Sequence, residues 1–396
     1  MKILIINNFN SNNRLGGVEH YLHELIDYSN SNETNLTFKW FGKDKLKTNW
    51  IEKFYHKTIT QEIIQEIEHF KPNIIHCFSI GAPITPHFME LAKRNGIKII
   101  FSFRDYYYIC PKNYMLNDKN EVLLKHDNAL ECILHHQPKR NILFDTLLHL
   151  KQSYHKKIIK KNIDYFLTPS DNLTDYVLSH FQKEGKTLSN PILIEPKTHS
   201  NSAENYILFV GRLVPEKGIF TLLKAFQNVI KKYPDEKLYI VGDGIQLLEL
   251  QNFVIKNNLS NVSFLGNKTR AELQTIYSKA KFTVVPSEYV EAYGNVILES
   301  LSFRKTVITS DLVGIKNEIV ENKVGLIYSF NNQMELEEKM IELLSNDNIK
   351  TELENNIPNY LATKTFAKHF LELQKIYEEF IKFRFILCWF FNTNKV

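Results

Sequence analysis

The chain has 396 residues, of which 43% are hydrophobic and 23% are charged, with 14 glycines and 12 prolines. This composition supports a buried core, predicts two or three domains with two favoured, and excludes disordered and collagen-like chains. The net charge of +5 arises within residues 1–190. It is too small for a dedicated nucleic-acid-binding protein, but it is compatible with acidic substrates or an anionic membrane surface.

Short apolar runs alternate with longer amphipathic segments in the first half of the chain, as in βαβ units and parallel sheets. The opening MKILIINNF predicts a buried strand rather than a signal peptide, because no cleavage site follows it. No apolar run reaches about 18 residues, so we expect no membrane-spanning helix. The predicted strands are Lys2–Asn7, Ile74–Cys77, Lys98–Phe103 and Tyr165–Thr168. The predicted helices are Val18–Tyr28, Gln61–His69, Pro83–Asn95 and Phe144–Asn162.

Two prolines and a polar cluster in Asn190–Asn205 predict a linker between domains. A second series of units follows, with strands expected in YILFV, LYIVG, VSFLG, FTVVP and TVITS. The predicted helices are Ile219–Lys232, Ile245–Asn257, Arg270–Ser278, Val296–Phe303 and Met334–Leu344. The two halves therefore predict two open α/β domains, with ligands at the C-terminal ends of the strands.

The loop GRLVPEKG, Gly211–Gly218, follows a predicted strand and precedes an amphipathic helix. Its two glycines allow a sharp turn and the close approach of a ligand. Arg212 and Lys217 share this loop, so we expect them to converge on one anion at the helix N-terminus, as a diphosphate site requires. The alternative is a surface loop with solvated charges, and the placement between strand and helix disfavours it.

The segment EAYGNVILE follows the strand FTVVP and carries two carboxylates with seven residues between them. Gly294 is expected to stop any preceding helix and Asn295 to be the N-cap of the next one, so that Glu291 lies in a loop and Glu299 in the helix. The N–H groups of Gly294, Asn295 and Val296 suit phosphate oxygens, whereas the carboxylates suit sugar or ribose hydroxyls. The alternative is a capped helix with solvated acids.

Gly16 and Gly17 open a helix after the first strand and its polar loop, which allows close ligand approach. Taken alone, this pair could belong to a flexible loop. It is not the G-x-G-x-x-G fingerprint of dinucleotide-binding proteins, which argues against an NAD enzyme.

Together these features resemble the family 4 glycosyltransferases, retaining enzymes of glycosyl transferases group 1. The similar segments lie within residues 16–325 and read GGVEHYLHEL, FSFRDYYYICP, YFLTPSDNL, VGRLVPEKG, LYIVGDG, VSFLGNKTRAEL and VVPSEYVEAYGNVILES. The resemblance implies the α/β GT-B fold, with two Rossmann-like domains facing across a cleft. Residues 1–190, joined by a C-terminal helix of about 372–396 that crosses back, would form the acceptor-side domain. Residues 200–371 would bind the nucleotide sugar.

The resemblance also implies a role for each motif residue, with a nucleoside-diphosphate sugar as donor. Arg212 and Lys217 would hold the diphosphate and would form the catalytic group together with Glu291, which would also contact the donor sugar. Glu299 would contact the ribose. The other implied substrate contacts are Gly16, Gly17, Arg104, Asp105, Gly266, Tyr293, Gly294, Asn295 and Val296.

The family needs neither a metal ion nor another cofactor, and Asp243 in VGDG is an isolated acid rather than part of a DxD-like motif. One position departs from the family, which often has a histidine where this chain has Arg104, before Asp105. Arg104 would bind an acidic group there, or the sugar geometry would differ. Alternatively, Arg104 and Asp105 pair with each other.

Four scattered cysteines suit a reducing compartment better than a disulfide framework. Cys110, Cys132, His135 and His136 raise the alternative of a zinc site. They favour it only weakly, because no C-x-x-C pair is present and adjacent histidines point apart on a helix. We therefore expect no metal.

For two segments of the chain, contact with a membrane is one of two interpretations. Lys156, Lys157, Lys160 and Lys161 form a stripe on a predicted helix, which is either a solvated face or a contact for anionic lipid head groups. The C-terminal FIKFRFILCWFF, residues 380–391, is too short to span a bilayer. It would pack on the first domain as in the family, or anchor at the head-group boundary.

We therefore predict a cytoplasmic, retaining hexosyltransferase, peripheral on the inner face of the membrane, that extends a bacterial cell-surface polysaccharide. Its partners would be a nucleotide-sugar donor and a glycan or lipid-linked acceptor, with no nucleic acid. The alternatives are a catalytically silent nucleotide-sugar-binding partner in a glycan-assembly complex, or an epimerase or phosphorolytic enzyme of the same fold.

Overall fold

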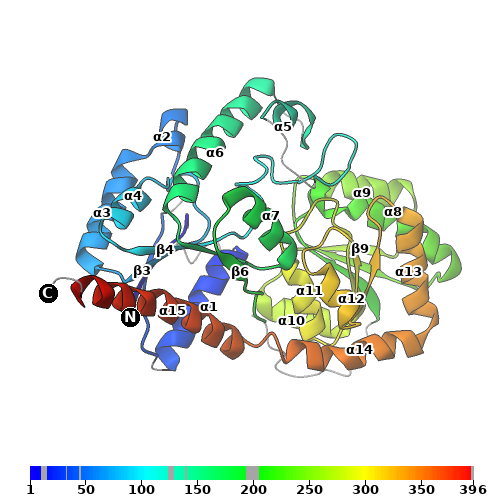
Figure 1. Ribbon diagram of the computed structural model, residues 1–396. Helices are drawn as coiled ribbons and strands as arrows, with labels where there is room; N and C mark the ends of the chain where they lie inside the picture. The colour runs from blue at the N-terminus through cyan, green and yellow to red at the C-terminus, as the bar shows by residue number, and fades with distance from the viewer. Residues whose placement is uncertain are drawn as a thin grey trace. The chain divides into compact units, whose positions relative to one another are not determined.

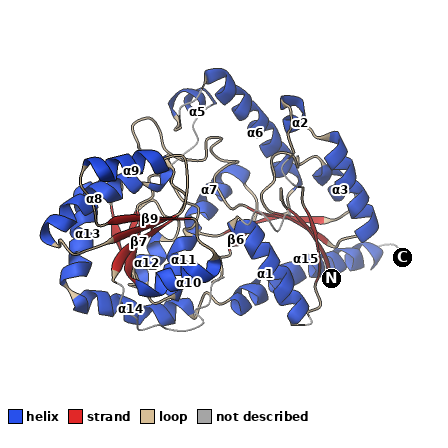
Figure 2. Cartoon of the chain, turned by 180° about the vertical axis from the view of Figure 1, so that it is seen from behind, coloured by secondary structure: helices blue, strands red, loops and turns tan. Residues whose placement is uncertain are grey.

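The computed structural model describes residues 1–9, 16–32, 34–43, 46–123, 129–138, 141–192 and 205–393, with side chains up to residue 381. The chain separates into two compact units. Unit 1 comprises Met1–Ser189 and the chain from Ala367 onward, and unit 2 comprises Asn190–Phe366. Each unit is a parallel sheet flanked by helices on both sides (Figures 1 and 2).

Unit 1 contains a six-stranded parallel sheet in the order β2-β1-β3-β4-β5-β6. Its strands are β1 (Lys2–Ile6), β2 (Thr37–Phe41), β3 (Ile74–Cys77), β4 (Lys98–Ser102), β5 (Tyr165–Thr168) and β6 (Gly185–Thr187). Four consecutive residues of β1 are completely buried, as expected for a central strand covered on both faces. The strand order reverses between β1 and β3, which is where open α/β sheets bind ligands.

Eight helices are described in unit 1. They are α1 (Gly17–Ser31), α2 (Trp50–Phe54), α3 (Lys57–Phe70), α4 (Phe88–Arg94), α5 (Ala129–His135), α6 (Ile142–Asn162), α7 (Asp171–Phe181) and α15 (Phe366–Thr393). Helix α15 is tied to the sheet by Tyr377, whose hydroxyl hydrogen-bonds to His76 Nδ1 at 2.6 Å. The last helix therefore returns to the first unit.

Unit 2 repeats this architecture with a six-stranded parallel sheet in the order β12-β11-β10-β7-β8-β9. Its strands are β7 (Tyr206–Val210), β8 (Leu238–Val241), β9 (Val262–Gly266), β10 (Ala280–Val285), β11 (Val307–Ser310) and β12 (Gly325–Tyr328). Here the order reverses between β7 and β10, so the loops that follow these two strands lie side by side.

The helical segments of unit 2 include one short 3₁₀ turn, η1 (Pro215–Lys217). The α-helices are α8 (Ile219–Lys232), α9 (Leu247–Lys256), α10 (Arg270–Lys279), α11 (Asn295–Ser302), α12 (Lys316–Glu321), α13 (Gln333–Ser345) and α14 (Asp347–Leu361). Helix α8 shows how the pattern determines packing. Its buried Leu222, Phe226 and Val229 recur at helical spacing and face the core that the sheet shares with α13.

The predicted fold class, two Rossmann-like α/β domains with a returning C-terminal helix, is confirmed. The predicted helix over Pro83–Asn95 is too long, because α4 begins only at Phe88. Pro83 and Pro86 lack the N–H donor and restrict the preceding residue, so the segment before Phe88 forms turns instead. Of the predicted linker, residues 193–204 lie outside the described residues, as do the side chains of the aromatic C-terminal segment from residue 382.

Among the residues that the structure describes, no helix has the length and apolarity needed to cross a membrane.

Candidate functional site

Two loops meet at the point of unit 2 where the strand order reverses. The loop after β7 ends at Gly218, whose φ of +67° is strained for other residues. A Cβ added there would lie 1.8 Å from the carbonyl oxygen of Pro286 in the loop after β10. The Glu288 N–H donates to the Glu216 carbonyl at 2.9 Å across the same contact. The two loops are therefore packed backbone against backbone, and only glycine fits at position 218.

An ion pair bridges these two loops. The Lys217 ammonium donates to Oε1 of Glu291, a residue that is 4% exposed. The same oxygen accepts from Ser287 Oγ at 2.8 Å. The Glu291 N–H donates to the Leu312 carbonyl at 3.0 Å, which fixes the backbone. Both members of the pair are thus held in place before any substrate binds, which is the condition for electrostatic preorganisation.

The Tyr289 side chain packs against the Lys217 ammonium of this ion pair. Its ring centroid lies 5.1 Å from the Lys217 ammonium, and its hydroxyl lies 3.4 Å from Nζ of that residue. Burial, and then the Glu291 carboxylate, raises the pKa of Tyr289. The phenol therefore stays protonated at neutral pH and can donate a hydrogen bond.

Arg212 has a different carboxylate neighbour from Lys217. Its guanidinium lies 3.5 Å from the Glu216 carboxylate, and its side chain is 70% exposed. Lys217 is thus a fixed cation paired with Glu291. Arg212 is a cation exposed to solvent. The exposed guanidinium retains the freedom to reach an anionic ligand.

Helix α11 begins at the same place. Gly294 is its N-cap with a φ of +114°, so the expectation that Asn295 would be the cap is wrong. The left-handed cap conformation suits glycine, and Asn295 becomes the first helical residue. Its exposed side chain accepts a hydrogen bond from Asn190 Nδ2 at 2.8 Å. The first-turn amides of Gly294, Asn295 and Val296 precede the intrahelical bonds and can bind an anion.

The Glu291 carboxylate lies next to this helix start. A Cβ on Gly294 would lie 3.5 Å from Glu291 Oε2 and 2.8 Å from Ile297 Cδ1, so glycine keeps the helix start open beside the carboxylate. Tyr293 is buried, and its hydroxyl donates to the Asn190 carbonyl at 3.2 Å. Val296 packs at the edge of the apolar cluster around α11.

Glu299 has different neighbours from Glu291. Its Oε2 accepts from the hydroxyl of the fully buried Tyr277 on α10 at 2.8 Å. Burial raises the pKa of Glu299, and this effect is opposed by the Tyr277 hydrogen bond and by Arg270. The structure therefore assigns the two glutamates of the EAYGNVILE motif to separate environments.

Gly266 ends β9 with a φ of +66° and has open space around its Cα. Its carbonyl accepts from the Gly242 N–H at 2.9 Å, which links the ends of β8 and β9. Gly266 thus lies on the same edge of the sheet as the β7 and β10 loops but two strands away from β7.

In unit 1, α1 begins at Gly17 after the N-cap Gly16. The buried Glu19 in its first turn accepts from Asn7 Nδ2 at 2.8 Å. A Cβ on Gly16 would lie 2.6 Å from Glu19 Oε2. The glycine pair therefore makes room for a buried carboxylate of the chain itself at the reversal point between β1 and β3.

Arg104 and Asp105 follow β4 and line a cavity of about 310 Å³ together with Asn8, Phe78, Tyr107 and Lys151. The Arg104 guanidinium lies 4.8 Å from the Tyr21 ring centroid and 5.3 Å from that of Phe78. Asp105 instead accepts from the Tyr107 N–H at 2.9 Å within its own loop. The two neighbours thus have different partners, and the cavity presents both a cation and aromatic rings.

The sequence did not single out Ser287, Tyr289, Tyr277 or Lys151. Ser287 and Tyr289 lie in the segment PSEYVEAYG directly after β10, so their position alone could have suggested them. Tyr277 and Lys151 lie within helices, where nothing local distinguishes them from other amphipathic positions. In the described part of the chain, no three His, Cys, Asp or Glu side chains are grouped so that they could hold a metal ion.

Comparison with known proteins relates the second half of the chain to a known family. Residues 193–360 match the family model of glycosyl transferases group 1. An uncharacterized glycosyltransferase of Methanocaldococcus jannaschii is 27% identical over 323 residues, which are 80% of this chain and 85% of that protein.

A second relative, from Campylobacter jejuni, is 32% identical over 207 residues, covering 51% of this chain and 55% of that protein. Its full name is GalNAc-alpha-(1->4)-GalNAc-alpha-(1->3)-diNAcBac-PP-undecaprenol alpha-1,4-N-acetyl-D-galactosaminyltransferase. The alignment thus spans about half of that enzyme.

Solved structures share the fold across both units. Sucrose-phosphate synthase from Thermosynechococcus elongatus superposes with a TM-score of 0.73 at 16% identity, covering 96% of this chain and 99% of that one. HepE of Anabaena, solved in complex with UDP, has a TM-score of 0.67 at 13% identity, covering 96% and 100%. With its two six-stranded parallel sheets the chain has the GT-B fold, and its residues 193–360 are similar to the glycosyl transferases group 1.

Proposed function

We propose that the protein is a retaining hexosyltransferase that moves a sugar from a nucleoside-diphosphate donor to a glycan or lipid-linked acceptor in bacterial cell-surface polysaccharide synthesis. The observation that carries the proposal is the Lys217–Glu291 pair at the start of α11. A fixed cation, a fixed carboxylate and unpaired helix amides suit a diphosphate and sugar hydroxyls at one place.

In this proposal, charge develops on the diphosphate leaving group as the sugar departs. Lys217, Arg212 and the amides of α11 stabilise that charge in the transition state, so the chain's own groups take the role that a metal ion has in other enzymes. Glu291 orients Lys217 and accepts from donor sugar hydroxyls, whereas Glu299 accepts from the ribose. The cavity beside Arg104 and Asp105 in unit 1 accommodates the acceptor.

Turnover tests this assignment. Release of UDP, GDP or ADP from a panel of nucleotide sugars would be measured with and without a membrane-lipid extract as the acceptor source. We expect release from one donor class that depends on the extract, and a loss of about 100-fold or more in Glu291→Ala. Extract-independent release, or normal turnover in Glu291→Ala with an unchanged melting temperature, would contradict the proposal.

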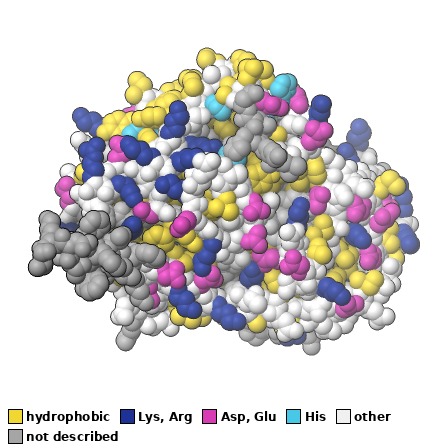
Figure 3. Space-filling model, viewed as in Figure 1, with side chains coloured by type: hydrophobic (Ala, Val, Ile, Leu, Met, Phe, Trp, Pro, Cys, Tyr) yellow, Lys and Arg dark blue, Asp and Glu magenta, His cyan; other side chains and the backbone are white. Residues whose placement is uncertain are grey.

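The surface of unit 1 favours a lipid-linked acceptor at a membrane. We call the exposed apolar residues at the tips of α2, α5 and α6 the apical patch: Ile51, Leu130, Leu134, Ile142 and Leu143. Figure 3 shows apolar side chains gathered over α5 and α6. Ile51 is 81% exposed and Leu143 is 66% exposed. Such a cluster marks an interaction surface.

Aromatic and cationic neighbours make a membrane the best-suited partner of the apical patch. The Trp50 ring lies 5.6 Å from that of Phe144, and the Lys53 ammonium lies 4.4 Å from the Trp50 ring. Indole rings next to lysine suit the boundary between head groups and acyl chains. The C. jejuni relative, whose name specifies a PP-undecaprenol-linked glycan, supports the same acceptor class.

Flotation with vesicles containing phosphatidylglycerol tests this part of the proposal. We expect the double variant Ile142→Ser/Leu143→Ser to lose vesicle binding. The matched control Ile245→Ser/Leu248→Ser alters two apolar residues of unit 2 that are more exposed than Ile142 and Leu143, and it should bind like the wild type. Equal binding by both double variants would exclude the apical patch as the membrane contact.

A further inference from the structure

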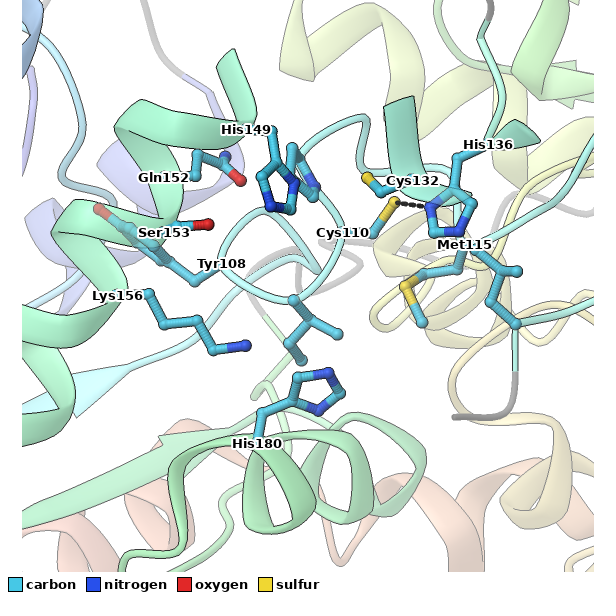
Figure 4. A pocket seen from close by; sticks show the side chains of 13 residues that line it. Tyr108, Cys110, Met115, Cys132, His136, His149, Gln152, Ser153, Lys156 and His180 are labelled. Carbon is cyan, nitrogen blue, oxygen red and sulfur yellow. Dashed lines mark hydrogen bonds between the residues drawn. The ribbon is translucent and has the colours of Figure 1, made fainter. Parts of the chain in front are cut away.

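Unit 1 contains a second, smaller cavity that the proposed transfer reaction does not use. Its volume is about 100 Å³, and it lies among the loop after β4, α5, α6 and α7 (Figure 4). Its lining includes the thiols of Cys110 and Cys132, the imidazoles of His136, His149 and His180, and the amide of Gln152. Among the described residues no carboxylate lines this cavity, so the described lining owes its charge to the thiols, the imidazoles and the Lys156 ammonium.

The two cysteines and one histidine meet at one wall of the cavity. Cys110 Sγ lies 3.6 Å from His136 Nδ1, and the Cys132 thiol hydrogen-bonds to Cys110. Figure 4 shows both sulfur atoms beside the His136 ring. The adjacent His135 is turned away, with Nδ1 at 3.1 Å from the Asp118 carboxylate. The structure thus selects one thiol pair and one imidazole from the four residues that had suggested zinc.

The surrounding charges hold this arrangement in place. The buried Lys112 ammonium lies 2.8 Å from the Asp145 carboxylate on α6 and donates to the His136 carbonyl at 2.9 Å. Hydrogen bonds from Cys132 and His136 outweigh burial and lower the pKa of the Cys110 thiol well below its ordinary value. Cys77 provides the contrast, because burial alone raises the pKa of its thiol. Of these two environments, the one around Cys110 favours the thiolate, which is the nucleophilic form of cysteine.

The cavity also contains unused hydrogen-bonding capacity. Within the described residues, both amide atoms of Gln152, which is 2% exposed, and Nδ1 of His149 have no hydrogen-bond partner. Buried polar atoms without partners call for a small polar molecule that donates and accepts at once. The space next to the Cys110 thiol suits a molecule of a few heavy atoms.

We propose that Cys110 and Cys132 form a reversible dithiol site that small hydroperoxides oxidise to a disulfide, with His136 activating Cys110. The Cys110 thiolate attacks the terminal oxygen of the hydroperoxide, the O–O bond breaks, and the leaving oxygen takes the proton that His136 received from the thiol. Cys132 then attacks Cys110 Sγ of the sulfenic acid, the S–O bond breaks, and the thiol proton leaves with the hydroxide as water. The two thiols lose the two electrons that the hydroperoxide gains.

The disulfide would link the loop after β4 to α5. This is the loop whose earlier residues Arg104 and Asp105 line the cavity of about 310 Å³. Tyr108 lines both cavities, so oxidation would change the mobility of a wall that they share. The chemistry itself does not depend on the transfer reaction and can be tested without a sugar substrate.

The test uses the full-length chain with Cys388→Ser, which leaves Cys77, Cys110 and Cys132. The protein is treated with hydrogen peroxide, the remaining thiols are blocked with N-ethylmaleimide after unfolding, and the peptides are analysed by mass spectrometry. We expect a Cys110–Cys132 cross-link that dithiothreitol removes, while Cys77 remains an alkylatable thiol. In Cys132→Ser, dimedone should trap the sulfenic acid at Cys110.

His136→Gln should slow the loss of the Cys110 thiol about tenfold, because a tenfold smaller thiolate fraction corresponds to about one pKa unit. His135→Gln is the control on the same helix and should react like the wild type. A Cys77 thiol that is still alkylatable after the peroxide treatment shows that the variant is folded. Oxidation of Cys110 no faster than that of Cys77 in the wild type, or a sulfenic acid at Cys110 that never forms the cross-link, would overturn the proposal.

Discussion

The two candidate sites lie at equivalent places in two similar sheets, where the strand order reverses, yet they are built differently. In unit 2, the loops after β7 and β10 pack backbone against backbone, and the Lys217–Glu291 ion pair joins them. In unit 1, the cavity of about 310 Å³ is lined by Arg104, whose guanidinium lies over the Tyr21 and Phe78 rings. The first arrangement suits a ligand whose charge and shape are constant. The second arrangement suits ligands whose shape varies.

This difference matches what each site would bind. A diphosphate is the same in every nucleotide sugar, so a rigid site with preset charges fits it. Acceptors differ between polysaccharides, and aromatic faces with one guanidinium tolerate several ring shapes. Substitutions at the two sites should therefore have different consequences.

The largest expected effect is at the contact between the two loops of unit 2. Gly218→Ala would place a methyl group against the Pro286 carbonyl, so one loop must move, at a cost of about 3 kcal/mol in the free energy of unfolding. Gly266→Ala is the control, because that glycine also has a positive φ but lies in open space, and it should cost only about 1 kcal/mol. Urea denaturation measures both. Equal losses would mean that the loop contact is not tight.

A smaller effect is expected at the cavity of unit 1. Arg104→Gln removes the guanidinium from the Tyr21 and Phe78 rings, so we expect the KM for the acceptor to rise about tenfold, which corresponds to about 1.4 kcal/mol. Steady-state kinetics at varied acceptor and fixed donor measure this change. If Arg104→Gln instead raised the KM for the donor alone, the division of tasks between the units would be wrong.

The smallest effect concerns pH. Burial raises the pKa of Glu299, so folding shifts its titration toward the neutral form. The favourable contribution of Glu299 to the free energy of unfolding is therefore present at low pH. It is lost as the pH rises from the pKa of Glu299 in the unfolded chain through its pKa in the folded protein. Glu299→Gln keeps the neutral shape at all pH values, and its melting temperature relative to the wild type should be higher at pH 7 than at pH 4. A difference independent of pH would show that the carboxylate is not desolvated.

The elements with a strong period could be predicted from the sequence, and so could most motif residues. Helix α8 begins and ends at the predicted residues because its apolar positions recur every three to four residues between Gly218 and Tyr233. Strand β6 was missed because GKT is short and only half-buried at the sheet edge. Helix α7 was not predicted, although Ser170 caps it and its buried Leu173, Val177 and Phe181 recur at helical spacing.

The arrangement of the site was harder to predict than its residues. Lys217 and Glu291 were both chosen from the sequence, but their contact joins positions 74 residues apart. It depends on β7 and β10 being neighbours, which strand pairing in the tertiary fold decides. The cavity of unit 1 is harder still, because its lining comes from the segments that follow β1 and β3, from β4 and the loop after it, and from Lys151 on α6, which the tertiary fold alone brings together.

The central claim is that the reversal point of unit 2 binds the diphosphate of the donor. Titration calorimetry with UDP, GDP and ADP, and with NAD as the control, tests it on the wild type, Arg212→Ala and Arg104→Gln. We predict that one diphosphate binds, that Arg212→Ala weakens it about 10- to 100-fold through loss of a charge-assisted hydrogen bond, and that Arg104→Gln leaves it unchanged. Binding that is insensitive to Arg212, or that is lost equally in Arg104→Gln, would contradict the claim.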